Sequence, residues 1–131
     1  MKFALLTAQR KEKIATLRWD DMADGVWAIR TEAREKGNAG RLRLPEEALD
    51  IIAAQPCIEG NPYVFTAARG AGPFNSFSEW KAQLDARLPA PLAHWTIHDL
   101  RRPARSLLSR AGVRPDISER VMGHPRCGRC L

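Results

Sequence analysis

The stretch Thr96-Ile97-His98-Asp99-Leu100-Arg101-Arg102 decides how this chain is interpreted. Thr96 is a suitable N-cap, and Asp99 follows three residues later, close to a capping box. We therefore predict a helix that begins here and ends at Gly112, a residue suited to helix termination. Its apolar face is expected to comprise Leu100, Ala104, Leu107, Leu108 and Ala111.

This helix opens the basic part of the chain. Residues 1–100 contain 13 Lys or Arg and 13 Asp or Glu, whereas residues 101–131 contain eight arginines and two acids, so the net charge of +6 lies in the last quarter. An excess on one side favours a polyanionic partner such as nucleic acid, although a solvated basic surface is the alternative. Arginine supplies the charge, and its guanidinium fork matches phosphate oxygens.

The rest of the pattern predicts a mainly α fold with a small antiparallel β-sheet, in the α+β class. Strand-like segments at 26–30 and 41–44 flank a charged, glycine-containing tip and predict a hairpin that carries Lys36. Tyr63 lies in a short apolar segment and is interpreted as a core residue. Helices are expected as two short pieces within 3–19, from Pro45, over 74–88, and over 115–122, the last with Ile117 and Val121 inward.

Length and composition narrow the class of protein. A chain of 131 residues is one domain by length. No apolar run is long enough for a membrane span, and the N-terminus does not resemble a signal peptide, so we expect a cytoplasmic protein that contacts no membrane. Three cysteines, an odd number, favour reduced thiols.

Four segments together resemble the boxes of the tyrosine recombinases, the phage integrase family. They are Leu6-Thr7-Ala8-Gln9-Arg10, Lys36 in the hairpin, His98-Asp99-Leu100-Arg101-Arg102, and Gly123-His124. H-x-x-R alone is a weak signal, but four boxes in order at fitting spacings are a strong one. The resemblance implies the fold of the family's catalytic domain, incomplete, over residues 1–124. We expect residues 125–131 to be an atypical C-terminal tail and the family's N-terminal core-binding domain to be absent.

The resemblance also implies a site and a chemistry. Members of this family use a tyrosine to attack a DNA phosphodiester. Arg10 and Arg101 would stabilise charge on the non-bridging oxygens. Lys36 would protonate the leaving 5′-oxygen, His98 would support proton transfer from the tyrosine, and His124 would hydrogen-bond the phosphate.

The family's partner is double-stranded DNA, and Lys11, Arg102 and Arg105 are the further residues expected to bind it. Bond energy is conserved in the phosphotyrosyl link, so no cofactor or metal ion is expected. Family members assemble as tetramers on DNA; for this chain we expect a monomer or a weak oligomer.

The sequence departs from the family pattern at several points. The nucleophilic tyrosine is expected after His124 and is missing, and Tyr63 is the single tyrosine. We therefore expect a chain unable to cleave DNA. Lys13 stands where the family often has glutamate. Pro103 stands where threonine is usual, and in a helix interior a proline costs about 3 kcal/mol or produces a kink.

Other interpretations remain open at this stage. Each of the site residues taken alone could be a solvated surface charge. A partner chain could supply the tyrosine in trans, or the chain could be a non-enzymatic DNA-binding protein or regulator. A zinc module is a further possibility, with His124, Cys127 and Cys130 at metal-like spacing and Cys57 as a fourth ligand.

Overall fold

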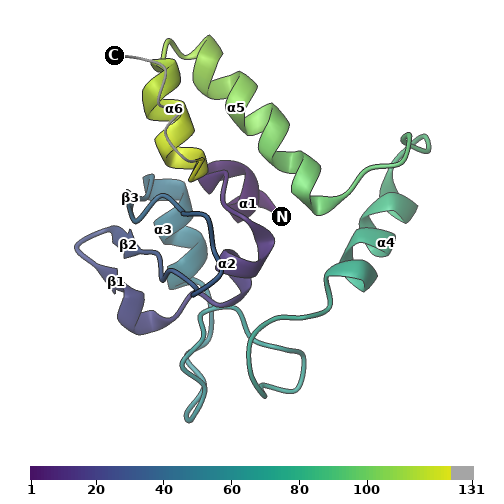
Figure 1. Ribbon diagram of the computed structural model, residues 1–131. Coiled ribbons are helices and arrows are strands. Elements are labelled where there is room, and N and C mark those ends of the chain that lie inside the picture. The colour runs from purple at the N-terminus through teal and green to yellow at the C-terminus, as the bar shows by residue number, and fades with distance from the viewer. Residues whose placement is uncertain (125–131) are drawn as a thin grey trace.

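A computed structural model describes residues 1–124 of the chain. The elements are α1 (Lys2–Thr7), α2 (Lys11–Ala15), the 3-10 helix η1 (Trp19–Asp21), β1 (Met22–Ala23), β2 (Val26–Ala28), β3 (Arg41–Arg43), α3 (Glu46–Ala53), α4 (Phe77–Arg87), the 3-10 helix η2 (Ile97–Leu100), α5 (Arg101–Arg110) and α6 (Pro115–Met122). This is the predicted mainly helical architecture with one small antiparallel sheet (Figure 1). None of the described helices has the length and apolarity needed to cross a bilayer.

The sheet contains the predicted hairpin and one further strand. β2 pairs antiparallel with β3 on one side and with β1 on the other, so that Trp27 lies opposite both Leu42 and Met22. The turn between β1 and β2 is Asp24-Gly25, with positive φ at both residues. An Asp-Gly pair is well suited to such a two-residue turn, because its mirror-image geometry matches the twist of the strands.

The main core lies between this sheet, α1 and α3. Trp27, Leu17 and Val64 are the largest fully buried side chains. They are joined in the same cluster by Phe3, Ile29, Leu44, Ala48 and Ile52. Burial of this aromatic and aliphatic surface is the main stabilising contribution to the fold, at about 25 cal/mol per Å².

A second, smaller core joins the N-terminus of the chain to its basic end. Ala8, Ala104 and Met122 are buried together where α1, α5 and α6 meet. Two of the three residues are alanine, so the helices can approach closely. Ala8 also ends α1 in the left-handed conformation, with φ of 56°. The chain turns there, and α2 starts three residues later.

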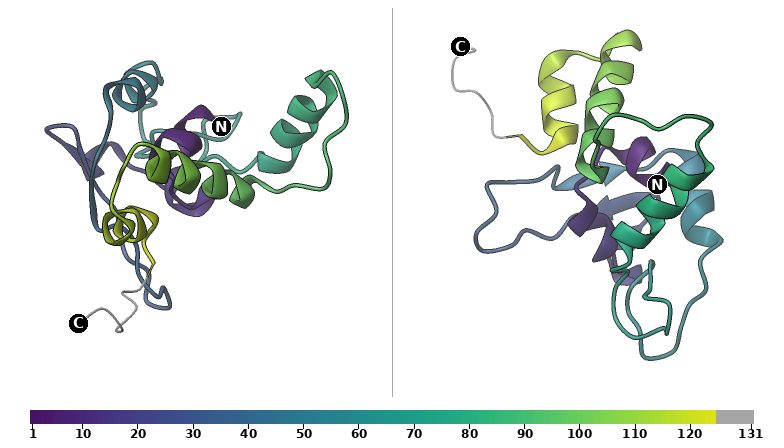
Figure 2. Two further views of the ribbon diagram at one scale, coloured as in Figure 1. Left: turned by 90° about the horizontal axis from the view of Figure 1, so that it is seen from above. Right: turned by 90° about the vertical axis from the view of Figure 1, so that its right-hand side faces the viewer.

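Some predicted apolar faces are exposed instead of buried. α4 buries no residue, and it stands away from the sheet and α3 in Figure 1 and in the left view of Figure 2. Trp80 is 58% exposed, and its ring neighbour is Phe74. On α5, Leu107 is 57% exposed, because Arg101 and Ala104 take the inner face. On α6, Ile117 is 44% exposed, because Ser118 and Met122 point inward.

Pro103 causes no break in the helix. The capping box predicted for Thr96 and Asp99 is present, but it opens the 3-10 turn η2, and the α-helix starts only at Arg101. Pro103 is thus the third residue of α5. The first four amides of an α-helix have no intrahelical acceptor, so a proline there removes no helical hydrogen bond. The expected kink does not arise.

Gly123 connects the end of α6 to the hairpin loop. It terminates the helix in the left-handed conformation, with φ of 68°. A Cβ at this position would lie 2.6 Å from the Cα of Asn38 and 2.9 Å from its carbonyl carbon. Both the backbone angle and the close approach therefore require glycine. This contact brings the loop that carries Lys36 against the residue that precedes His124.

This double requirement can be measured with Gly123→Ala and a matched control, Gly112→Ala. Gly112 has φ of 77° but nothing within 4 Å of an added Cβ. Gly112→Ala should therefore lower the free energy of unfolding by only about 1 kcal/mol, the cost of holding alanine in the left-handed conformation. Gly123→Ala should lower the free energy of unfolding by at least about 1 kcal/mol more, because the backbone atoms of Asn38 must move away from the added Cβ. Urea denaturation of both variants tests this, and equal losses would contradict the close packing of the loop on α6.

Candidate phosphate-binding site

Arg101 is the buried centre of the site. It is the first residue of α5 and is 5% exposed. Its Nε donates to the carbonyl of Ala8 at 2.9 Å, and its Nη2 donates to the carbonyl of Met122. These carbonyls end α1 and α6, where helices carry unsatisfied acceptors and a partial negative charge. Arg101 thus caps two helices and retains further N–H donors for a ligand.

The amide of Gln9 strengthens the same junction. Its Nε2 donates to the carbonyl of Thr7 at 2.9 Å and to that of Val121 at 2.6 Å. The residue after Gln9 is Arg10, the N-cap residue of α2. The segment from Leu6 to Arg10 therefore connects α1 to α2. Its buried Gln9 binds the end of α6, and Arg10 follows at the surface.

The charge of Arg101 has no acidic partner in residues 1–124. The pKa of Arg101 is lowered, first because burial disfavours the cation and second because the charge of Arg10 is close by. Two neighbouring guanidiniums, one of them buried, repel each other and are poorly solvated. An anion between them would relieve both effects, so the arrangement is suited to binding an anion such as phosphate.

A pocket of about 210 Å³ opens above Arg101. Its lining consists of His98, Arg101, Arg102, Arg105, Met122 and His124. His98 lies on η2, which is fixed because the Asp99 carboxylate accepts hydrogen bonds from the amide and the hydroxyl of Thr96 at 2.7 and 2.8 Å. The structure therefore brings together three of the five predicted catalytic residues and two of the three predicted DNA-binding residues.

Glu119 orients His124, one of the two histidines of this pocket. Its Oε2 is 2.5 Å from Nδ1 of His124, and its Oε1 is 2.5 Å from Nη2 of Arg105. With Nδ1 engaged, Nε2 is the ring nitrogen left to meet a ligand. Glu119 is not among the residues that the family resemblance places in the site. Its place five residues before His124, one helical turn and a cap away, is the signal that could have indicated it.

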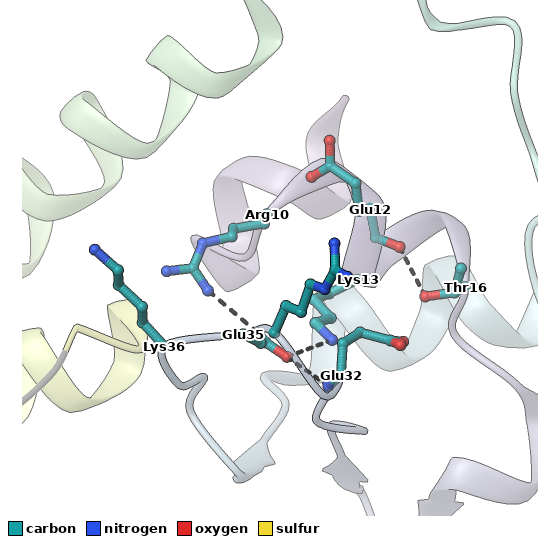
Figure 3. Close-up of a pocket in the computed structure, with 8 residues that line it drawn as sticks. Arg10, Glu12, Lys13, Thr16, Glu32, Glu35 and Lys36 are labelled. Atoms are coloured by element: carbon teal, nitrogen blue, oxygen red, sulfur yellow. Dashed lines mark hydrogen bonds and ion pairs between the residues drawn. The ribbon is translucent and has the colours of Figure 1, made fainter.

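Arg10 and Lys36 line a second, adjoining pocket of about 520 Å³. Arg10 Nη1 donates to the carbonyl of Gly37 at 2.9 Å and to Glu35 at 3.3 Å. Lys36 is exposed on the loop between β2 and β3, and its side chain points away from Glu35 (Figure 3). The two pockets are linked by the electrostatic effect of Arg10 on Arg101 and by the packing of the loop on Gly123.

Two other predicted residues lie outside both pockets. Lys11 is exposed, with its Nζ 5.7 Å from the ring of Phe77. Tyr63 is half-buried, pairs through its backbone with Arg18, and has that guanidinium 5.2 Å from its ring. The prediction of Tyr63 as a core residue is therefore wrong, because its side chain is only half-buried and lies outside the core cluster.

The described residues include two of the four suggested zinc ligands, Cys57 and His124. Residues 125–131, which include Cys127 and Cys130, lie beyond them. Within residues 1–124 no group of three or more His, Cys, Asp or Glu residues is arranged to hold a metal ion. Cys57 is exposed.

Comparison with known proteins shows the family to which the chain is similar. Residues 1–128 match the model of the phage integrase family. The prophage integrase IntF of Escherichia coli K12 is 30% identical over 129 residues, which are 95% of this chain but 27% of that protein, so the chain spans about a quarter of its length.

Two solved structures share the fold. The Tn1549 transposon integrase in complex with circular intermediate DNA has a TM-score of 0.72 and 19% identity, over 95% of this chain and 48% of that one. A lambda integrase tetramer bound to a Holliday junction has a TM-score of 0.67 and 19% identity, over 98% and 40%. The family match over nearly the whole chain, together with this shared fold, shows that the protein belongs to the phage integrase family, the tyrosine recombinases.

Proposed function

We propose that this chain binds double-stranded DNA and holds one phosphodiester between Arg10 and Arg101. The observation that carries the proposal is the buried guanidinium of Arg101, which lies within electrostatic range of the Arg10 guanidinium and pairs with no carboxylate in residues 1–124. Two guanidiniums can donate to the non-bridging oxygens of one phosphate and stabilise the charge that builds there during phosphoryl transfer.

The other predicted residues have consistent positions around this phosphate. His98 and His124 line the pocket of Arg101, and the Nε2 of His124 is available to donate to a phosphate oxygen. Lys36, on its loop beside Arg10, would donate the proton to the leaving 5′-oxygen. These roles are those of a strand-exchange site for site-specific recombination, and the lambda and Tn1549 integrases, which were captured on DNA, support the choice of partner.

The proposal for the 131-residue polypeptide acting alone is binding without strand cleavage. Its single tyrosine, Tyr63, lines neither pocket and is engaged with Arg18. We further expect the free chain to be a monomer or weakly associated, because its excess positive charge lies at one end and like charges repel. Sedimentation of the free protein tests that expectation.

The phosphate contacts predict a steep salt dependence of DNA binding. Each phosphate contact that is lost should reduce the slope of log Kobs against log salt by about 1. We expect this change for Arg102→Ala, since Arg102 is exposed at the pocket of Arg101. Fluorescence anisotropy with a duplex oligonucleotide at several salt concentrations measures it.

Arg69→Ala is the matched control for this measurement. Arg69 is an exposed arginine in a turn and lines neither pocket. Arg69→Ala removes the same charge as Arg102→Ala. An identical slope of log Kobs against log salt for both variants would show that binding follows net charge alone and would contradict the proposed site.

The absence of cleavage is tested with a nicked duplex that traps covalent protein–DNA intermediates. The wild-type chain should retard this DNA in a native gel but form no adduct that survives denaturation. Tyr63→Phe should behave in the same way. An adduct formed by the wild-type chain would overturn the cleavage-deficient proposal, and its loss in Tyr63→Phe would identify Tyr63 as the nucleophile.

A further inference from the structure

The carboxylate of Glu35 receives more polar contacts than any other side chain around the two pockets in the described part of the chain. Its side chain is 11% exposed. Four donors converge on its two oxygens: Arg10 Nη1 at 3.3 Å, Lys13 Nζ at 2.7 Å, the Glu32 amide at 3.0 Å and Asn38 Nδ2 at 3.4 Å.

These donors come from two separate parts of the chain. Arg10 and Lys13 belong to α2 and its N-cap, and Glu32 belongs to the loop itself (Figure 3). Asn38 lies in the same loop, between β2 and β3. The ladder between β2 and β3 ends with the hydrogen bond from the Ile29 amide to the Gly40 carbonyl. Beyond that point the loop depends on such side-chain contacts for its order.

Lys13 explains why an acid is needed in the loop. Lys13 lies on α2 and is 8% exposed. A buried ammonium without a partner is strongly unfavourable. Its Nζ donates to the Arg30 carbonyl at 2.6 Å and pairs with Glu35. The charges at this place are therefore arranged with the cation on the helix and the carboxylate on the loop.

Glu35 is ionised at neutral pH. Burial alone raises its pKa, but the hydrogen bonds from Lys13 and from the Glu32 amide, with the charge of Lys13, outweigh burial and hold the pKa below its ordinary value. The loop therefore carries a fixed negative charge directly behind Lys36.

We propose that Glu35 is a positioning residue that clamps the loop to α2, so that Lys36 lies beside Arg10 before DNA arrives. The role assigned to Lys36 rests on the proposed function. The clamp acts together with the packing of Asn38 on Gly123, so the loop is fixed on both sides.

The contacts of Glu35 have an electrostatic consequence that distinguishes this residue from an ordinary surface acid. Glu35 occupies Arg10 Nη1, a donor that a phosphate would use, and it lowers the local positive potential. Its removal should therefore leave phosphate affinity equal or higher, while the order of the loop and the placement of Lys36 are lost. A surface acid without these contacts would affect affinity only.

The experiment uses Glu35→Gln, with Glu32→Gln as the matched control in the same loop, since only the backbone amide of Glu32 takes part in the clamp. Glu35→Gln leaves the buried Lys13 without its charged partner, which destabilises the fold, so the double variant Glu35→Gln/Lys13→Met removes both charges together. Hydrogen exchange of residues 31–39 reports the order of the loop. We expect at least tenfold faster exchange in both Glu35 variants and wild-type exchange in Glu32→Gln.

A separate NMR measurement reports the position of Lys36. Lysines are dimethylated with ¹³C, and the Lys36 signal, assigned by its loss in Lys36→Arg, is followed while inorganic phosphate is added. In the wild type and in Glu32→Gln this signal should shift with phosphate. In the double variant the amides of α5 should still shift, whereas the shift of Lys36 should be reduced severalfold.

The outcomes separate the clamp from the proposed function. Unchanged loop exchange and an unchanged Lys36 shift in the double variant would overturn the clamp, even if phosphate binds. Phosphate-induced shifts absent from α5 in the wild type, with the loop still released in the variants, would overturn the proposed function and support the clamp.

Discussion

The structure depends on one buried guanidinium that joins three helices. Arg101 starts α5 and donates to the carbonyls that end α1 and α6, so a single side chain fixes the relative position of segments more than 90 residues apart. A buried cation is tolerated here because helix C-termini present partial negative charge in a fixed orientation. The same contacts restrict the guanidinium to one orientation. The residue that would bind phosphate is thereby also the residue that assembles the domain, and the ligand site exists only where the helices have docked.

Two carboxylates contact the cationic and imidazole groups of this site. Glu119 contacts His124 and Arg105, and Glu35 contacts Arg10. In both cases an acid holds a nitrogen-bearing side chain in place, and neither acid lines the pocket of Arg101. Arg101 itself is held by neutral carbonyls. Within the described residues, Arg101 therefore keeps its positive charge unpaired and available to a ligand. The acids that orient Arg10, Arg105 and His124 also reduce the positive potential around those side chains.

The sequence predicted the elements better than the faces they bury. Short-range chemistry, such as the Thr96–Asp99 box, is local and could be recognised, and the four boxes placed His98, Arg101 and His124 in one pocket. Burial could not be predicted in this way. Apolar spacing on α5 and α6 indicated Leu107 and Ile117 as core residues, yet Arg101, Ala104, Ser118 and Met122 face inward, because reaching the two carbonyls determines the rotation of α5. Glu35 escaped notice for a similar reason: its partners are 22 and 25 residues away along the chain, and no periodicity encodes them.

The place of Glu35 on the loop, and not on α2, determines what its charge can do. An acid on the helix would orient Arg10 alone. Glu35 contacts both Arg10 and Lys13 from the loop, so it orients the arginine and also ties the loop, and with it Lys36, to the helix. A single carboxylate therefore couples the two predicted donors of this site, one to the non-bridging oxygen and one to the leaving oxygen.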